Sequence, residues 1–143
     1  INFFQLSDLV SIVAPIGIFL GRLANFINVE LYGRKTEFFF AMIYPNIDNQ
    51  PRHPSQLYEA FFEGIVLFIF MNFFFRKYLY KSPGVISSLF LVFYSIFRFL
   101  IEYTREPDSH LGFVFLNLTQ GQIISILFFI IGLILFYKKN ASQ

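Results

Sequence analysis

Residues 21–34 read GRLANFINVELYGR, and this stretch directly follows an apolar run that starts near Leu9. It holds two arginines, two asparagines and one glutamate. A segment that only crossed a bilayer would not carry these groups, because charged side chains are costly in hydrocarbon. Guanidinium groups flanked by amides at a membrane boundary suit phosphate or carboxylate oxygens. The stretch therefore predicts a membrane protein with an anion site at one end of its first span.

The composition agrees with a membrane protein. The chain has 143 residues, of which 56% are hydrophobic and 14% are charged. Soluble domains carry about 25% charged residues. A surface with so little charge has to face lipid, and the 23 phenylalanines add large apolar area to it.

Several kinds of site are excluded or unsupported. The chain has no cysteine, so it supplies no disulfide, thiolate metal site or cysteine nucleophile. His53 and His110 lack a metal-binding spacing. The net charge of +2 is too small and too scattered to indicate nucleic acid as a partner. We therefore expect no cofactor, no metal ion and no nucleic acid.

Four apolar segments predict an all-α, polytopic membrane protein with about four transmembrane helices. Asp8 is the expected start of the first span, and Pro54 with Ser55 is typical of the start of the second. The polar segments between them carry prolines, amides and other turn-forming residues. The expected spans are 9–29, 57–75, 85–103 and 118–137.

Four spans place both ends of the chain on one side of the membrane. The compact basic clusters Arg76–Lys77 and Lys138–Lys139, together with Lys81, then share that side. Cytoplasmic loops carry an excess of lysine and arginine, so this side is predicted to be cytoplasmic. The segments 21–34, 52–59 and 98–108 would then gather on the outer face.

The first span ends in a polar stripe. Arg22, Asn25 and Asn28 are each three residues apart, so they share one helix face. Such a stripe is typical either of hydrogen bonds that hold helices together or of a ligand site. Gly21 and Gly33 flank it and would permit a close backbone approach or a tight turn.

The third span also ends in charge. Arg98 and Glu102 are four residues apart, and Arg105 continues the same face. One interpretation is a self-neutralising ion pair or interfacial anchor, and the other is a charged site within the bundle. Arg22 and Arg98 together would form a clamp for a phosphate, with apolar surroundings for acyl chains. Binding, transport and catalysis all remain open at this point.

The second span begins with further polar residues. His53 has the position of a capping or surface residue, with a catalytic role as the alternative, and Gln56 and Tyr58 add polar groups beside it. Glu59 and Glu63 are interpreted as an acid–base pair, as acids at a helix N-terminus, or as counter-ions for arginines.

Four blocks in the chain closely resemble the bacterial prolipoprotein diacylglyceryl transferases. The first is the stretch 21–34, and the second is 52–59, RHPSQLYE. The third is 97–108, with Arg98, Glu102 and the run REPD, and the fourth is Gly121–Gln122 with Ser125. The blocks stand in the order of the family and together span most of the chain.

The resemblance implies a multi-pass enzyme of the bacterial inner membrane, with its active site toward the periplasmic face. The family transfers the diacylglyceryl group of phosphatidylglycerol to the lipobox cysteine of a prolipoprotein signal peptide and releases glycerol phosphate. The nucleophilic thiol comes from the substrate, which agrees with a chain that has no cysteine. Expected partners are therefore phosphatidylglycerol, the prolipoprotein and membrane lipids.

The resemblance also implies roles for individual residues. Arg22 and Arg98 match arginines that act on phosphatidylglycerol, and Glu102 is the acidic neighbour of Arg98. Asn25 and Glu30 match catalytically important positions of the signature. Further candidates are Asn28, Gly33, His53, Gln56, Tyr58 and Arg105.

The chain also departs from the family pattern. The family has additional spans and an earlier His-Gly-Gly motif, which residues 1–143 lack. We therefore expect the C-terminal part of a single catalytic domain, inactive without an N-terminal half. Ala24 and Val29 stand where the family usually has small residues, often glycine, and Val29 is expected to tighten the local packing.

Two other functions use the same arginines. An anionic-lipid transporter would pass the anion onward, although the internal repeats common in transporters are not found in this sequence. A non-catalytic lipid-binding membrane protein would tolerate lysine at Arg22 and Arg98, whereas a bidentate phosphate clamp would not.

Overall fold

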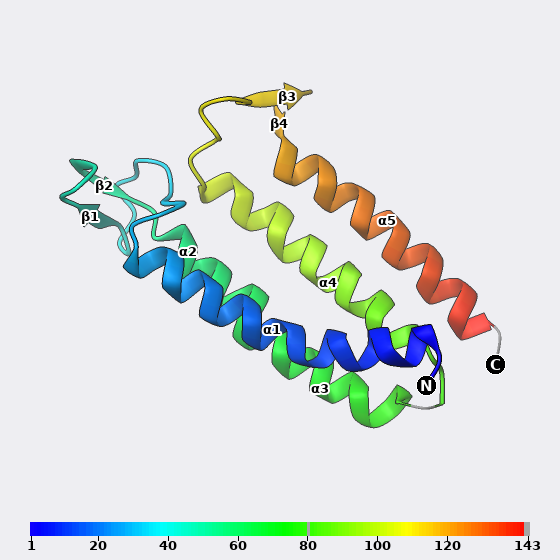
Figure 1. Ribbon diagram of the computed structural model, residues 1–143. Coiled ribbons are helices and arrows are strands. Elements are labelled where there is room, and N and C mark those ends of the chain that lie inside the picture. Colours follow the sequence, from blue (N-terminus) through cyan, green and yellow to red (C-terminus); the bar gives the residue numbers. More distant parts are fainter. Residues whose placement is uncertain (80, 142–143) are drawn as a thin grey trace.

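Four long helices dominate the computed structural model, which describes residues 1–79 and 81–141 (Figure 1). Within these residues, four helical stretches are long and apolar enough to cross a membrane: Phe3–Ile27, Ser55–Tyr78, Val85–Thr104 and Gln120–Ala141. The prediction of an all-α, polytopic membrane protein is confirmed.

Helix α1 (Phe3–Ile27) begins earlier than its hydropathy indicated. Asn2 caps it, because the Asn2 side chain accepts from the Gln5 amide at 2.9 Å while the Gln5 side chain accepts from the Asn2 amide. Asp8, the expected start, lies within the helix and is 1% exposed. Its carboxylate instead accepts from the backbone amides of Gly84 and Ser87, both at 2.8 Å, and so caps the helix that begins at Val85.

The second membrane-crossing stretch combines three segments. It consists of α2 (Ser55–Glu59), a π-helical segment η1 (Ala60–Val66) and α3 (Leu67–Tyr78). The predicted start at Pro54 and Ser55 is confirmed, with Pro54 as the N-cap residue. A π-helical segment is rare and often marks a functional site. Here it lies between Glu59, the last residue of α2, and the core-forming α3.

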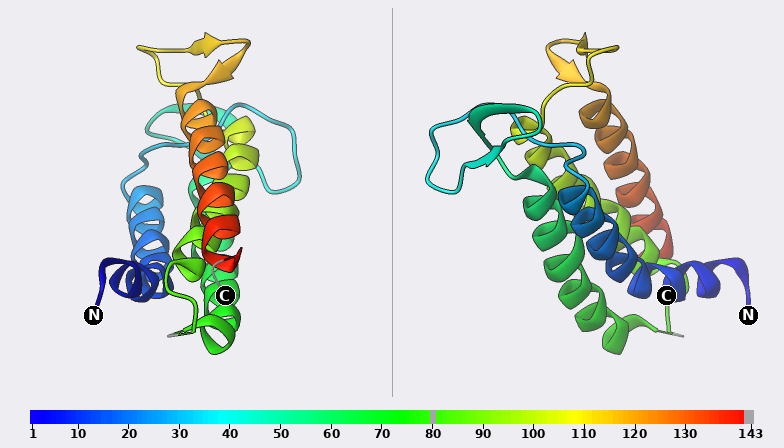
Figure 2. Two further views of the ribbon diagram at one scale, coloured as in Figure 1. Left: turned by 90° about the vertical axis from the view of Figure 1, so that its right-hand side faces the viewer. Right: turned by 60° about the vertical axis from the view of Figure 1, so that its left-hand side comes forward.

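The last two helices run side by side, as Figures 1 and 2 show. Helix α4 (Val85–Ile101) ends in a single 3₁₀ turn, η2 (Glu102–Thr104), and α5 (Gln120–Ala141) follows after a loop. The fourth span was expected from residue 118, but Leu118 and Thr119 form a strand. Thr119 and Gln122 set the helix start, because each side chain accepts a hydrogen bond from the other residue's amide.

Two short hairpins were not expected from the sequence. Strands β1 (Met42–Tyr44) and β2 (Asp48–Arg52) pair antiparallel, with Met42 opposite Arg52. Strands β3 (Phe113–Phe115) and β4 (Leu118–Thr119) form the other hairpin. Both hairpins lie at one end of the bundle, and the start of α1 and the end of α5 lie at the other (Figure 1).

The buried apolar core lies between α1, α3 and α4. Its centre is formed by Ile12, Leu67, Met71 and Ile86, and the rings of Phe74 and Phe93 stack beside it with centroids 5.8 Å apart. Large apolar side chains elsewhere on the helices are exposed, as membrane-facing helices require. The charged side chains buried in the bundle concentrate at the end that carries the hairpins.

Candidate functional site

The stretch after α1 is held by backbone hydrogen bonds between two other segments. The Gly33 amide donates to the His53 carbonyl, the His53 amide donates to the Arg34 carbonyl, and the Arg34 amide donates to the Thr104 carbonyl, at 2.9–3.0 Å. A Cβ atom at Gly33 would lie 2.3 Å from the His53 oxygen and 2.6 Å from the Thr104 oxygen. A close backbone approach therefore explains Gly33, whereas a Cβ atom at Gly21 would meet open space.

Arg52 ties this loop to the first hairpin. Its guanidinium contacts the Asp48 carboxylate at 2.8 Å, the Gly33 carbonyl at 3.1 Å and the Glu106 carboxylate at 3.2 Å. The hydrogen bond from Arg52 holds the pKa of the Asp48 carboxyl below its usual value. Arg52 therefore stabilises the end of the bundle on which the charged site lies.

Glu59 is the centre of that site. Its carboxylate is 0% exposed and meets three arginines from three segments of the chain. Arg22 of α1 approaches with Nε at 3.0 Å, Arg98 of α4 donates through Nη1, and Arg105 lies 3.4 Å away. Arg22 and Arg98 therefore converge, as expected from their positions, and they do so on a carboxylate of the second span.

Glu102 is bound on several sides. Arg98 Nη2 lies 3.0 Å from its carboxylate and Arg105 Nε lies 3.9 Å away. The Thr119 hydroxyl donates to it at 2.9 Å. A Cβ atom at Gly121 would lie 2.9 Å from the Glu102 carboxyl group, so the start of α5 packs directly on this acid. The i,i+4 pair of Arg98 and Glu102 is therefore part of a larger network.

Glu63 completes the network from within the π-helical segment. It is 0% exposed, and its carboxylate lies 3.7 Å from Arg22 Nη2 and 4.0 Å from Arg98 Nη1. Three arginines thus face three glutamates, and their formal charges cancel. We call these six residues the Arg–Glu network: Arg22, Glu59, Glu63, Arg98, Glu102 and Arg105.

The other residues expected in the first block lie around this network. Asn25 shares a pocket with Arg22, Gly21 and Tyr94. Asn28 is exposed and ends α1, and Glu30 is exposed as well. Among the ion pairs of the described residues, Glu30 takes no part; its backbone carbonyl accepts from the Gln56 side chain at 2.7 Å.

The second block, residues 52–59, begins the helix that carries Glu59 and is itself held by hydrogen bonds. Gln56 is fully buried and accepts from the Tyr44 hydroxyl at 3.3 Å. His53 Nδ1 lies 3.3 Å from the Tyr58 hydroxyl, and burial lowers the pKa of the His53 imidazole. Across residues 1–79 and 81–141, the structure holds no group of three or more His, Cys, Asp and Glu residues that is arranged for a metal ion.

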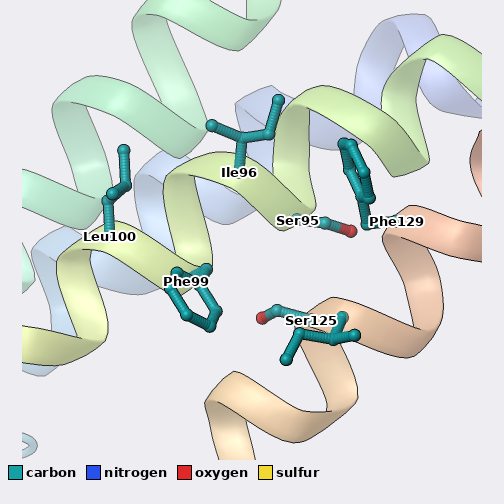
Figure 3. A pocket seen from close by; sticks show the side chains of 7 residues that line it. Ser95, Ile96, Phe99, Leu100, Ser125 and Phe129 are labelled. Atoms are coloured by element: carbon teal, nitrogen blue, oxygen red, sulfur yellow. The ribbon is translucent and has the colours of Figure 1, made fainter.

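Two cavities open beside the network. A polar cavity of about 240 Å³ is lined by Arg98, Glu102, Arg105 and Gly121, among others. An apolar cavity of about 250 Å³ lies between α4 and α5, and Figure 3 shows the Ser95 and Ser125 hydroxyls at its wall. Arg98 and Ile124 line the polar cavity, and their chain neighbours Phe99 and Ser125 line the apolar cavity. The two cavities are therefore adjacent along α4 and α5.

The central position of Glu59 could not be read from the chain alone. The counter-ion interpretation of Glu59 and Glu63 is the one that the ion pairs confirm. The available signal was their i,i+4 spacing in an otherwise apolar span, which puts two carboxylates on one buried face.

Four membrane-crossing helices around buried arginines and glutamates define a multi-pass membrane protein with a charged site inside its bundle. The chain belongs to the prolipoprotein diacylglyceryl transferase family, whose sequence model matches residues 1–138. It is 54% identical, over 98% of its length, to the phosphatidylglycerol–prolipoprotein diacylglyceryl transferase of Rickettsia akari. The enzymes of the same name from Rickettsia typhi and Rickettsia bellii are both 51% identical to it, over 99% and 100% of the chain respectively. The chain spans about half the length of these curated relatives, 54–55%.

Proposed function

We propose that this chain is part of an enzyme that transfers the diacylglyceryl group of phosphatidylglycerol to the lipobox cysteine thiol of prolipoproteins. Glycerol phosphate is the second product. The observation that carries the proposal is the convergence of Arg22, Arg98 and Arg105 on one buried carboxylate beside a polar cavity. Arginines arranged in this way suit a phosphodiester group at the membrane boundary.

The proposed chemistry uses the arginines twice. Arg22 and Arg98 bind the phosphate oxygens of phosphatidylglycerol in place of part of their contact with Glu59. The thiolate of the substrate cysteine then attacks the glyceryl carbon, a C–S bond forms, and the C–O bond to the phosphate breaks. Charge develops on the departing glycerol phosphate, and the same guanidinium groups stabilise it. Glu102 keeps Arg98 oriented for this task through its 3.0 Å contact.

The apolar cavity between α4 and α5 is the proposed place for an acyl chain. It is lined mainly by Ile96, Phe99, Leu100, Ile126 and Phe129 (Figure 3). Its neighbourhood with the polar cavity lets one lipid place its phosphate near Arg98 and an acyl chain between the helices. Membrane-facing apolar walls favour this occupant over water.

We further propose the bacterial inner membrane as the location. The basic residues Arg76 and Lys77 end α3 and Lys138 and Lys139 lie in the last turn of α5, at the end of the bundle away from the hairpins. By the positive-inside tendency this end is cytoplasmic, and the Arg–Glu network then faces the periplasmic side. Because the chain spans about half the length of its relatives, we propose that it acts as a C-terminal half together with further spans, and that it is inactive alone.

The test is diacylglyceryl transfer to a lipobox peptide by the protein expressed from its complete gene. Replacing Arg22 by alanine should lower turnover by a factor of about 100 or more, because one arginine no longer stabilises the leaving phosphate. Arg76→Ala, at an exposed arginine of α3, is the matched control and should keep full turnover. Undiminished turnover of Arg22→Ala would overturn the assignment. Lipid movement across vesicle membranes without any thioether product would instead identify a transporter.

A further inference from the structure

Glu63 differs from the other acids of the Arg–Glu network. It is 0% exposed, and neither oxygen of its carboxylate has a hydrogen-bond partner. Its nearest arginine nitrogens, on Arg22 and Arg98, are 3.7 and 4.0 Å away. Glu59 and Glu102, by contrast, each have an arginine nitrogen within 3.0 Å. A buried carboxylate without donors is costly as an anion.

The groups that face Glu63 come from each element packed around it. Arginines from α1, α4 and the segment after η2 attract its negative charge, a neighbouring glutamate opposes it, and the uncharged phenol of a tyrosine on α4 also lies within electrostatic range. These groups are Arg22, Glu59, Tyr94, Arg98 and Arg105. The proton affinity of Glu63 is therefore set by the occupancy of the same arginines that are proposed to bind lipid phosphate.

Charge balance determines what happens when an anion enters. The network is formally neutral, since three arginines face three glutamates. A phosphodiester group adds one negative charge to a poorly solvated region, where unbalanced charge is expensive. One added proton restores neutrality. Protonation of Glu102 would weaken its 3.0 Å contact with Arg98, and Glu59 keeps the hydrogen bond from Arg105 when Arg22 and Arg98 turn to the phosphate, whereas Glu63 has no hydrogen bond to lose.

We propose that Glu63 takes up one proton when the anionic headgroup of a phospholipid binds to Arg22 and Arg98. The inference rests on the proposed function, because it needs a lipid phosphate at these arginines. Linkage makes the effect reciprocal, so a proton on Glu63 strengthens lipid binding and the lipid strengthens proton binding. Lipid affinity should then fall with rising pH, by up to about tenfold per pH unit.

The experiment counts protons during lipid binding. The protein expressed from its complete gene is placed in phosphatidylcholine nanodiscs and titrated calorimetrically with short-chain phosphatidylglycerol. Two phosphate-free buffers with the same pH and different ionisation enthalpies are compared. We expect about one proton taken up per bound lipid. In Glu63→Gln the uptake should disappear and the affinity should become independent of pH, because glutamine does not ionise.

The controls separate the possible failures. Glu37→Gln changes an exposed acid outside the network and should keep the full proton uptake. Short-chain phosphatidylcholine adds no net charge and should cause no uptake. If phosphatidylglycerol binds to the unmodified protein with a heat that does not depend on the buffer, no proton is taken up. This result would overturn the role of Glu63 but leave the lipid site standing, and it does not require Glu63→Gln to fold. Unchanged proton uptake in Glu63→Gln would overturn it as well. Absence of phosphatidylglycerol binding would overturn the proposed lipid site together with this inference.

Discussion

The two ends of the helical bundle each bury a carboxylate, but the two acids have different partners. Asp8, near the start of α1, is 1% exposed and accepts two backbone amide hydrogen bonds at 2.8 Å. Glu63, toward the hairpin end, is 0% exposed and accepts none. Equal burial therefore accompanies opposite degrees of hydrogen bonding: Asp8 makes a structural contact, and Glu63 keeps the free hydrogen-bonding capacity on which the proposed proton uptake rests.

The physical reason lies in what each acid faces. The amides at Gly84 and Ser87 belong to the first turn of a helix and cannot leave without unfolding it, so Asp8 locks α1 to α4. The arginines at the hairpin end have long side chains and can exchange one anion for another. On the proposed function a phosphate replaces a carboxylate there, whereas the cap on α4 is part of the fold.

The largest effect should come from Arg98→Lys at the hairpin end. Lysine keeps the charge but has no planar fork, so it cannot contact Glu59 and Glu102 together or bind a phosphate bidentately. We expect turnover to fall by a factor of about 10²–10³. Transfer assays on the complete protein would show this, with Arg76→Lys in α3 as the control. Turnover within a few-fold of the unmodified enzyme would mean that a simple positive charge is sufficient.

Gly33→Ala should destabilise the hairpin end of the bundle by displacing its backbone. Its Cβ atom would overlap two backbone carbonyl oxygens, at 2.3 and 2.6 Å, so the backbone would have to shift. We expect a loss of about 3 kcal/mol in the free energy of unfolding, measured by denaturant titration in mild detergent. Gly21→Ala is the matched control from the same stretch, because its Cβ atom meets open space. Equal stability of the two variants would show that the loop can shift aside.

Asp8→Ala should weaken the opposite end without changing the chemistry. It leaves the buried Gly84 amide and the Ser87 amide without their acceptor, so we expect a loss of about 2 kcal/mol in stability. Turnover per folded molecule, measured well below the unfolding temperature, should not change. A fall in turnover that exceeds the loss of folded protein would contradict the division between a structural end and a functional end.

The smallest effect is expected at Val29, which has a φ of +58°. A β-branched residue in the left-handed region is strained, and this explains better than packing why a glycine would suit the position. Val29→Gly should raise stability by about 0.5–1 kcal/mol, after the greater freedom of glycine in the unfolded chain is subtracted. Thermal unfolding of the two proteins side by side would detect it, and a destabilised glycine variant would show that the valine side chain contributes packing.

Hydropathy and local chemistry predicted much of the fold. The four spans and the helix start after Pro54 follow from apolar length and from proline geometry, both of which are local. The start of α1 was wrong because Asp8 resembles a cap in sequence but caps a different helix in space. The first hairpin was missed because its strands are short and carry turn-forming residues; Arg52 ties it to Gly33 and Glu106, which lie far away in the chain.

The candidate site shows the same division. The position of Arg22 and Arg98 near helix ends, among polar residues, indicated that they share a site. Glu59 could not be identified as their common partner, because the sequence does not say which neighbouring helix the face of the second span that carries Glu59 packs against. The free hydrogen-bonding capacity of Glu63 was also hidden, because it depends on how α1 and α4 pack against η1, which leaves the Arg22 and Arg98 nitrogens 3.7 and 4.0 Å from its carboxylate, beyond hydrogen-bond length.

The sequence by itself determined a membrane protein with four spans, the residues that resemble the transferase family, and the presence of charge at the span ends. These properties depend on composition, period and spacing along one chain. Only the tertiary structure decided that three arginines meet one buried carboxylate, that Asp8 locks two helices, and that Glu63 remains without a donor. Such contacts join residues from different helices, and their distances follow from how those helices pack.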